Sequence, residues 1–267
     1  MLKVRQRISE KQAKKMILDL VRKSDHSNRS HTDTLNNKQI EAWFNQNQYP
    51  FKQLVTSSRD FKVIIPFVEN ILPTTFHVHV SGGEASVIDA NGDSQASING
   101  AGSLNMSDYQ GKFESAMKYR DRAIQHADIE EYYSCLSKLF ASLESYFNYK
   151  ALVYNQTAAD KLIDSKQSPV SLEDKIRDWI PILAPGNKVD RGNKCGQLFK
   201  QQLLERNNQA IHPKSSAQAT SYADLAQKLN ELRDGVIKLT YDIYSVLEVE
   251  MKSQVIRSVY HPDVYTD

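Results

Sequence analysis

The feature that most constrains how this chain folds is a long apolar row near its C-terminal end. Apolar side chains recur there at alternating steps of four and three residues: Leu225, Leu229, Leu232, Val236, Leu239, Ile243 and Val246. This spacing places them along one side of an α-helix, and such a row needs a partner surface that shields it from water. The sequence therefore predicts a long helix packed within a helical bundle.

Similar spacing marks further helices in the C-terminal half of the chain. One apolar row consists of Ile129, Tyr132, Leu136, Leu139, Leu143 and Tyr146, with Phe140 and Phe147 widening it. Another helix is expected to open at Ser171 and to be limited by Pro181, and a third is expected over residues 196–212. The expected fold is mainly α, with an up-and-down helical bundle at residues 107–255 and a tail at 256–267.

Residues 1–105 predict a smaller region of mixed α/β structure. Helical spacing covers residues 9–22, with Ser9 as the N-cap, and a shorter helix is expected at 38–45. Two strands are expected, at 61–65 and 76–80. The role of this region stays open between sensing, regulation and dimerisation.

Residues 81–105 are rich in Gly, Ser, Asn and Asp. Two short β-like pieces, 85–88 and 95–98, lie between turn-forming residues. The composition fits either a small hairpin or a mobile linker.

Bulk composition excludes several classes of protein. The chain of 267 residues has a net charge of only +2, so nucleic-acid binding would depend on local patches. Its two cysteines, Cys135 and Cys195, form no Cys-x-x-Cys pair, so neither a zinc site nor a disulfide framework is expected. No apolar run suits a membrane span and no signal peptide is recognisable, so we expect a cytoplasmic protein without membrane partners.

The segment from Arg206 to His212 carries the most chemistry. Arg206 interrupts an apolar stripe of its helix, and Asn207 follows it directly. His212 precedes Pro213, which disfavours α conformation at the histidine and places it where the helix ends. The segment therefore combines a permanent cation, an amide and a group that exchanges protons near neutral pH.

This pattern resembles the HEPN superfamily (higher eukaryotes and prokaryotes nucleotide-binding domains). The signature of that superfamily is an Arg, usually followed by Asn, Asp or His, and then a His a few residues later. Here Arg206, Asn207 and His212 match it, with five residues between the Arg and the His. A helical bundle with the motif late in one helix, followed by a long amphipathic helix, is similar as well. The resemblance covers roughly residues 107–255.

The resemblance implies an endoribonuclease that needs no metal or other cofactor. In such enzymes the ribose 2′-OH attacks the adjacent phosphate and leaves a 2′,3′-cyclic phosphate. His212 would act as base or acid, Arg206 would stabilise the transition-state charge, and Asn207 would hold the histidine or the phosphate. Members usually form homodimers with a shared cleft. They are often toxins or antiphage effectors, some of them controlled by an antitoxin or another regulatory protein.

Cations flank the motif and are candidates for guiding an RNA backbone, although surface charges are more often merely solvated. They are Lys188, Arg191, Lys194, Lys200 and Lys214. A structural alternative exists for the motif itself: Arg206 would pair with Glu144 on the preceding helix, and His212 would cap a helix C-terminus. The protein would then be a non-catalytic interaction module. A third hypothesis is a DNA-binding regulator that uses the basic first helices.

Two other patterns imitate metal sites. His77 and His79 would share one face of a strand, yet no third ligand can be placed, so incidental histidines are favoured. Asp89, Asn91 and Asp93 imitate the start of a calcium loop, but the later positions of that loop lack the required Gly and Glu, which indicates a turn. No metal site is expected.

Overall fold

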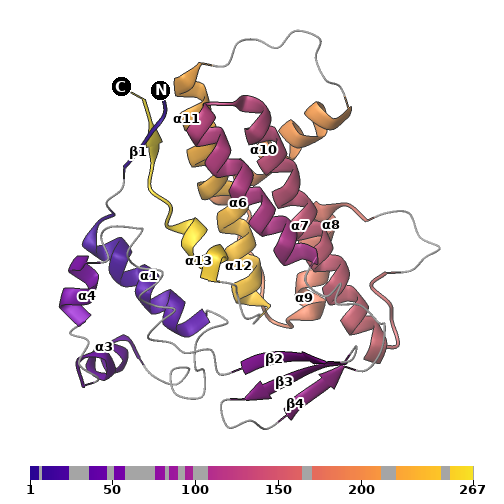
Figure 1. Cartoon of the computed structure of the whole chain (residues 1–267). Coiled ribbons are helices and arrows are strands. Elements are labelled where there is room, and N and C mark those ends of the chain that lie inside the picture. The colour runs from indigo at the N-terminus through magenta and orange to yellow at the C-terminus, as the bar shows by residue number, and fades with distance from the viewer. Residues whose placement is uncertain are drawn as a thin grey trace. The chain divides into compact units, whose positions relative to one another are not determined.

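A computed structural model gives the fold of the chain (Figure 1). It describes residues 1–5, 8–23, 36–46, 51–57, 76–81, 84–89, 94–98, 108–163, 170–211, 221–247 and 253–266. The chain divides into two compact units. Unit 1 consists of Met1–Arg5, Met106–Val249 and Asp263–Asp267, and unit 2 of Gln6–Asn105 and Glu250–Pro262. The described chain is mainly α-helical, as the apolar spacing predicts.

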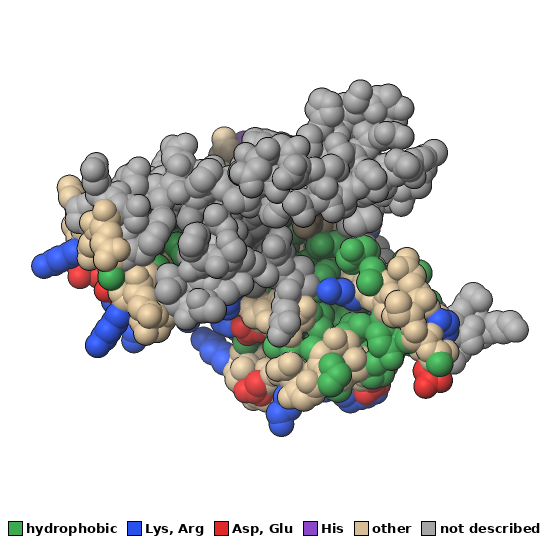
Figure 2. All heavy atoms as spheres, turned by 90° about the horizontal axis from the view of Figure 1, so that it is seen from below, with side chains coloured by type: hydrophobic (Ala, Val, Ile, Leu, Met, Phe, Trp, Pro, Cys, Tyr) green, Lys and Arg blue, Asp and Glu red, His purple; other side chains and the backbone are tan. Residues whose placement is uncertain are grey.

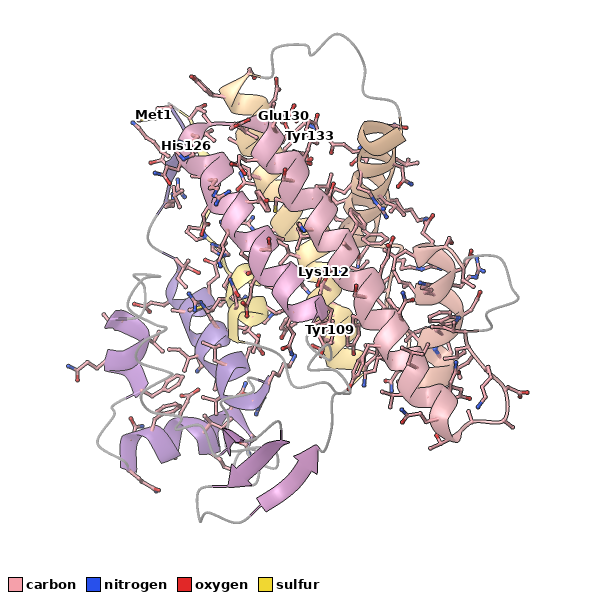
Figure 3. The ribbon with its side chains drawn as sticks, turned by 45° about the vertical axis from the view of Figure 1, so that its right-hand side comes forward. Met1, Tyr109, Lys112, His126, Glu130 and Tyr133 are labelled. Atoms are coloured by element: carbon pink, nitrogen blue, oxygen red, sulfur yellow. The ribbon has the colours of Figure 1, made fainter. Side chains whose placement is uncertain are left out.

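Unit 1 is built around two antiparallel helices, α6 (Asp108–His126) and α7 (Ile129–Thr157). In Figure 3, α6 runs from Tyr109 to His126, and α7 begins beside that end at Glu130. The reversal needs only Ala127, with φ 53°, and Asp128, whose side chain accepts a hydrogen bond from the backbone N–H of Glu130 and so caps α7. The apolar row of α7 is buried except at Ile129, which is half-buried.

A helical segment with a π-helical turn follows α7. It comprises α8 (Leu172–Asp174), η2 (Lys175–Trp179) and α9 (Ile180–Leu183), and Ser171 caps its start. The expectation that Pro181 limits this helix is wrong, because the helix continues through the proline. Pro181 lies at the start of α9, directly after the π turn η2.

The long C-terminal helix is present, with one irregularity that the spacing does not predict. It consists of α11 (Tyr222–Leu232), η3 (Arg233–Ile237) and α12 (Lys238–Val246). The seam residues are buried except Val246, which is half-buried. The π turn η3 lies in the middle, where Gly235 has φ −101° and ψ −105°. Helix α10 (Lys194–Ile211) packs against this long helix and against α7 (Figure 1).

The two ends of the chain meet in unit 1. Strand β1 (Lys3–Val4) pairs antiparallel with β5 (Val264–Tyr265), and Asn230 of α11 exchanges two hydrogen bonds with the backbone of Val264. The structure therefore groups the first and last residues of the chain with the bundle, whereas the sequence analysis placed domain boundaries at 105, 107 and 255. Backbone pairing between distant segments leaves no trace in local spacing.

Unit 2 combines helices with a small sheet. Its elements are α1 (Glu10–Lys23), α3 (Asn37–Gln46), α4 (Phe51–Ser57), β2 (Phe76–Ser81), β3 (Glu84–Asp89), β4 (Ser94–Ile98) and α13 (Ser253–Val259). The antiparallel sheet has the order β2-β3-β4, so the residues after 81 form a hairpin rather than a linker alone. The sequence analysis did not predict α4, and the strand expected at 61–65 lies outside the described residues.

Candidate functional site

Helix α10, which carries the Arg206 motif, is fastened to the π turn of the long helix. Gln202 is only 3% exposed, and its Oε1 accepts a hydrogen bond of 2.9 Å from the backbone N–H of Val236. Cys195 Sγ donates to the Gly235 carbonyl at 3.4 Å. A Cβ at Gly235 would lie 2.4 Å from Gln202 Oε1, so only glycine admits this approach without rearrangement. The anchor lies one helical turn before Arg206 and sets the orientation of that residue.

Arg206 is half-buried between an aromatic ring and a carboxylate of α7. Its Nη2 donates to Glu144 Oε1 at 2.8 Å, and its Cζ lies 5.3 Å from the centroid of the Phe140 ring. Its Nε is buried and has no hydrogen-bond partner among the residues that the structure describes. The pairing with Glu144 raised as the structural alternative is therefore present, but it uses only part of the donor set of the guanidinium.

The remainder of the motif is only partly described. Asn207 is half-buried on α10, directly after Arg206. The helical backbone is described as far as Ile211, the residue immediately before His212. His212 and Lys214 lie outside the described residues. The structure therefore gives the surroundings of the guanidinium but no distance between it and the imidazole.

Three of the flanking cations are exposed, and one of these, Lys194, lies well away from Arg206. Lys194 and Lys200 are exposed on α10, and Lys188 is exposed in the loop before it. Lys194 lies twelve residues before Arg206, about 18 Å along the helix axis, and helps to line a groove of about 490 Å³ beside α11 and β5. Arg191 is half-buried and donates to the Glu173 carbonyl at 3.3 Å. The structure does not bring Lys194 to the guanidinium.

A lysine that was not expected from the sequence contacts the same face of α7 as Arg206 does. Lys175, on η2, is 9% exposed and donates from Nζ to Asn148 Oδ1 at 2.7 Å. Its Nζ lies 5.2 Å from the centroid of the Trp179 ring. Burial lowers the pKa of Lys175, and the charge of Glu144 opposes that shift. The four-residue step from Glu144 to Asn148, which places both on one face of α7, was the only available signal in the sequence.

The residue before Arg206 belongs to a different cluster. Glu205 accepts a hydrogen bond of 2.8 Å from the Tyr132 hydroxyl and forms an ion pair with Lys228 of α11. The Lys228 Nζ lies 5.4 Å from the centroid of the Tyr132 ring. Burial, and then the charge of Glu205, raise the pKa of Tyr132, so its hydroxyl stays a donor at physiological pH. This cluster balances one carboxylate with one cation.

The two patterns that imitate metal sites lie largely outside the residues that the structure describes. No group of three or more His, Cys, Asp or Glu side chains suited to a metal ion occurs among the residues that the structure describes. His77 and His79 lie on β2, opposite Ile88 and Ser86, but their side chains are outside the described set. Asp89 ends β3, and residues 91 and 93 are not described.

Comparisons of the chain with protein-family models, curated proteins and solved structures found no match. Among its described helices none combines the length and the apolar character that a membrane span requires.

Proposed function

We propose that this chain is a metal-independent endoribonuclease of the HEPN type, with Arg206, Asn207 and His212 as its catalytic residues. One observation carries the proposal. Arg206 is held half-buried near the end of a bundle helix, with a buried Nε that has no hydrogen-bond partner among the described residues. A guanidinium that is already oriented suits an oxyanion, which accepts hydrogen bonds from the planar fork of an arginine.

The proposed reaction is an intramolecular transesterification. The ribose O2′ attacks the adjacent phosphorus, the bond from phosphorus to O5′ breaks, and the products carry a 2′,3′-cyclic phosphate and a 5′-hydroxyl. His212 takes the proton of the 2′-OH or gives one to the leaving O5′. Arg206 stabilises the charge that builds up on the phosphoryl oxygens, and Asn207 holds the imidazole or the phosphate.

The same proposal includes an assembly and a biological role, both of which rest on the HEPN resemblance. Two copies of the chain would bring two motifs to one cleft. The protein would act as a toxin or antiphage effector, silent until triggered and controlled by an antitoxin or another regulatory partner. Unit 2 would then supply sensing, regulation or dimerisation.

The test is cleavage of RNA by the purified full-length protein in the presence of EDTA. We expect products that end in 2′,3′-cyclic phosphate, and we expect His212→Ala to abolish cleavage while the circular dichroism spectrum stays unchanged. Loss of cleavage in EDTA, or undiminished cleavage by His212→Ala, would overturn the proposal.

A second function, a non-catalytic interaction module, is favoured by exposed apolar side chains. Leu204, two residues before Arg206, is 63% exposed and could contact a partner surface. Hydrophobic side chains also gather on the described part of the face shown in Figure 2. If the wild type cleaves no RNA but self-associates in light scattering, and Leu204→Asp makes it monomeric, this function replaces the first.

A further inference from the structure

Two cations from different helices converge on one row of α7. Glu144 and Asn148 are four residues apart, so their side chains point from the same face of that helix. Arg206 of α10 pairs with Glu144 at 2.8 Å, and Lys175 of η2 donates to Asn148 at 2.7 Å. The charge of Glu144 also acts on Lys175. The row therefore joins two cations that lie 31 residues apart in the chain.

The charges of this cluster do not balance. Among the residues that the structure describes, Glu144 is its one carboxylate, Asn148 is neutral, and Arg206 and Lys175 are both cations. Lys175 is 9% exposed, and its Nζ forms no ion pair with any carboxylate that the structure describes. A shielded ammonium without a counter-ion is unfavourable, because the charge loses hydration that a neutral amide replaces only in part. An anion from outside would supply the missing charge.

We propose that Arg206 and Lys175 together form a binding site for the phosphodiester backbone of single-stranded RNA, and that Glu144 occupies the guanidinium of Arg206 until a phosphate displaces it. The choice of RNA as the source of the phosphate rests on the proposed function. Arginine binds phosphate oxygens through its planar fork of donors, and lysine binds them as a point charge.

Glu144 is placed to compete with a phosphate for the guanidinium of Arg206 rather than to hold that group permanently. Its side chain is 39% exposed, more than that of Arg206 at 24%, so it can turn toward solvent while the guanidinium stays in place beside Phe140. Carboxylate and phosphate oxygens accept the same pair of N–H donors. Removing the negative charge of Glu144 should therefore strengthen RNA binding, whereas removing either cation should weaken it.

The experiment measures binding of a fluorescent, fully 2′-O-methylated single-stranded RNA to the full-length protein by anisotropy, over a series of KCl concentrations. Lys175→Met and Arg206→Met should each lower the magnitude of the slope of log K against log [KCl] by about 0.7, the value for one phosphate contact on a single strand. Glu144→Gln should bind several-fold more tightly than wild type. Lys118→Met removes an exposed lysine of α6 and is the matched control, with no change of slope expected.

A purely structural Lys175 would lower the thermal stability of Lys175→Met without changing the slope, and that result would overturn the proposal. So would a wild type that fails to bind the RNA at low salt, or a Glu144→Gln that binds no more tightly than Glu114→Gln, an exposed control on α6. Should Lys175→Met not fold, Lys175→Gln keeps a donor for Asn148 and carries the same test. Because this RNA has no free 2′-OH, binding is read without cleavage. A change of slope in a protein that never cleaves ordinary RNA would remove the enzyme proposal and leave this site intact.

Discussion

Two consecutive residues of α10, Glu205 and Arg206, belong to two clusters that have similar composition but differ in their balance of charge. Glu205 meets the hydroxyl of Tyr132 and the ammonium of Lys228, so one carboxylate is matched by one cation and one neutral donor. Arg206 meets Glu144 beside the ring of Phe140, and the same row of α7 also holds Lys175. Both clusters join α7 to a neighbouring helix, and both combine an aromatic ring, a carboxylate and a cation.

The difference between them lies in what remains unmatched. In the Glu205 cluster each carboxylate oxygen has a donor, which is the arrangement expected of a contact that stabilises the fold. Within the described part of the chain, a positive charge is left over in the Arg206 cluster, and the Nε of the guanidinium has no acceptor. A buried polar group without a partner calls for an explanation, and a bound ion is one of them.

The largest expected effect is on catalysis, at the Arg206 cluster. Arg206→Met should lower the rate of RNA cleavage by about 100-fold or more, because the guanidinium would no longer stabilise charge on the phosphoryl oxygens. Its partly exposed ion pair contributes about 1 kcal/mol or less to folding. Cleavage rates measure the effect on catalysis, and urea unfolding of the same preparation measures the effect on stability. If Arg206→Met unfolds readily yet retains the wild-type rate of cleavage, Arg206 has a structural role and not a catalytic one.

The second effect is on folding, at the Glu205 cluster. Glu205→Gln should lower the free energy of unfolding by about 1–3 kcal/mol, because a hydrogen bond to a charged group weakens and Lys228 loses its counter-ion. The rate of cleavage per folded molecule should stay at the wild-type value. Urea unfolding measures the first and active-site-normalised kinetics the second. The same substitution at exposed Glu114 is the control and should change neither.

A third substitution tests the support that the two clusters share. Gly235→Ala would displace the buried carboxamide of Gln202, whose Oε1 would lie 2.4 Å from the new Cβ, and we expect a loss of about 1–3 kcal/mol of stability. Gly111→Ala on α6 meets no atom within 4 Å and should instead gain up to about 1 kcal/mol. Thermal unfolding compares the pair. Equal behaviour of the two variants would mean that Gln202 does not anchor α10.

The smallest expected effect is on how stability depends on pH. It distinguishes Lys175, which has no ion-pair partner among the described residues, from the cations that form ion pairs. Burial lowers the pKa of Lys175, so between that lowered value and the ordinary lysine value of about 10.5 the unfolded chain binds more protons than the folded one. This residue therefore makes the free energy of unfolding rise with pH across that window. Lys175→Met cannot titrate and should lack the rise. Urea unfolding at a series of alkaline pH values measures the difference between the two proteins, and a difference independent of pH would contradict the assigned environment.

The spacing of apolar residues predicts most helices of unit 1, but it does not predict the irregular turns within them. The apolar rows of α7 and of the long C-terminal helix follow from spacing alone, because burying one face of a helix leaves a regular imprint. The π turns η2 and η3 leave none. Gln202 occupies a position that local spacing treats as an ordinary polar one, and its role depends on a backbone N–H of Val236 that lies 34 residues away in the chain.

The candidate site likewise contains some residues that the sequence identifies and others that it does not. The motif residues Arg206, Asn207 and His212 and the possible pairing with Glu144 could be named from the chain, since each lies at a recognisable position on an expected helix. Lys175 could not be selected, because no feature near it in the sequence separates it from the other lysines. Its place beside Asn148 depends on how the segment that contains η2 folds back onto α7.

By itself, the amino-acid sequence determined which segments become helices and where the single arginine interrupts an apolar stripe, because these depend on neighbours within one or two turns. Only the tertiary structure decided which charges meet. Arg206 and Glu144 lie 62 residues apart, and Lys175 and Asn148 lie 27 apart. The balance of charge around a side chain is a sum over everything packed against it, and helix packing, not local spacing, brings those groups together.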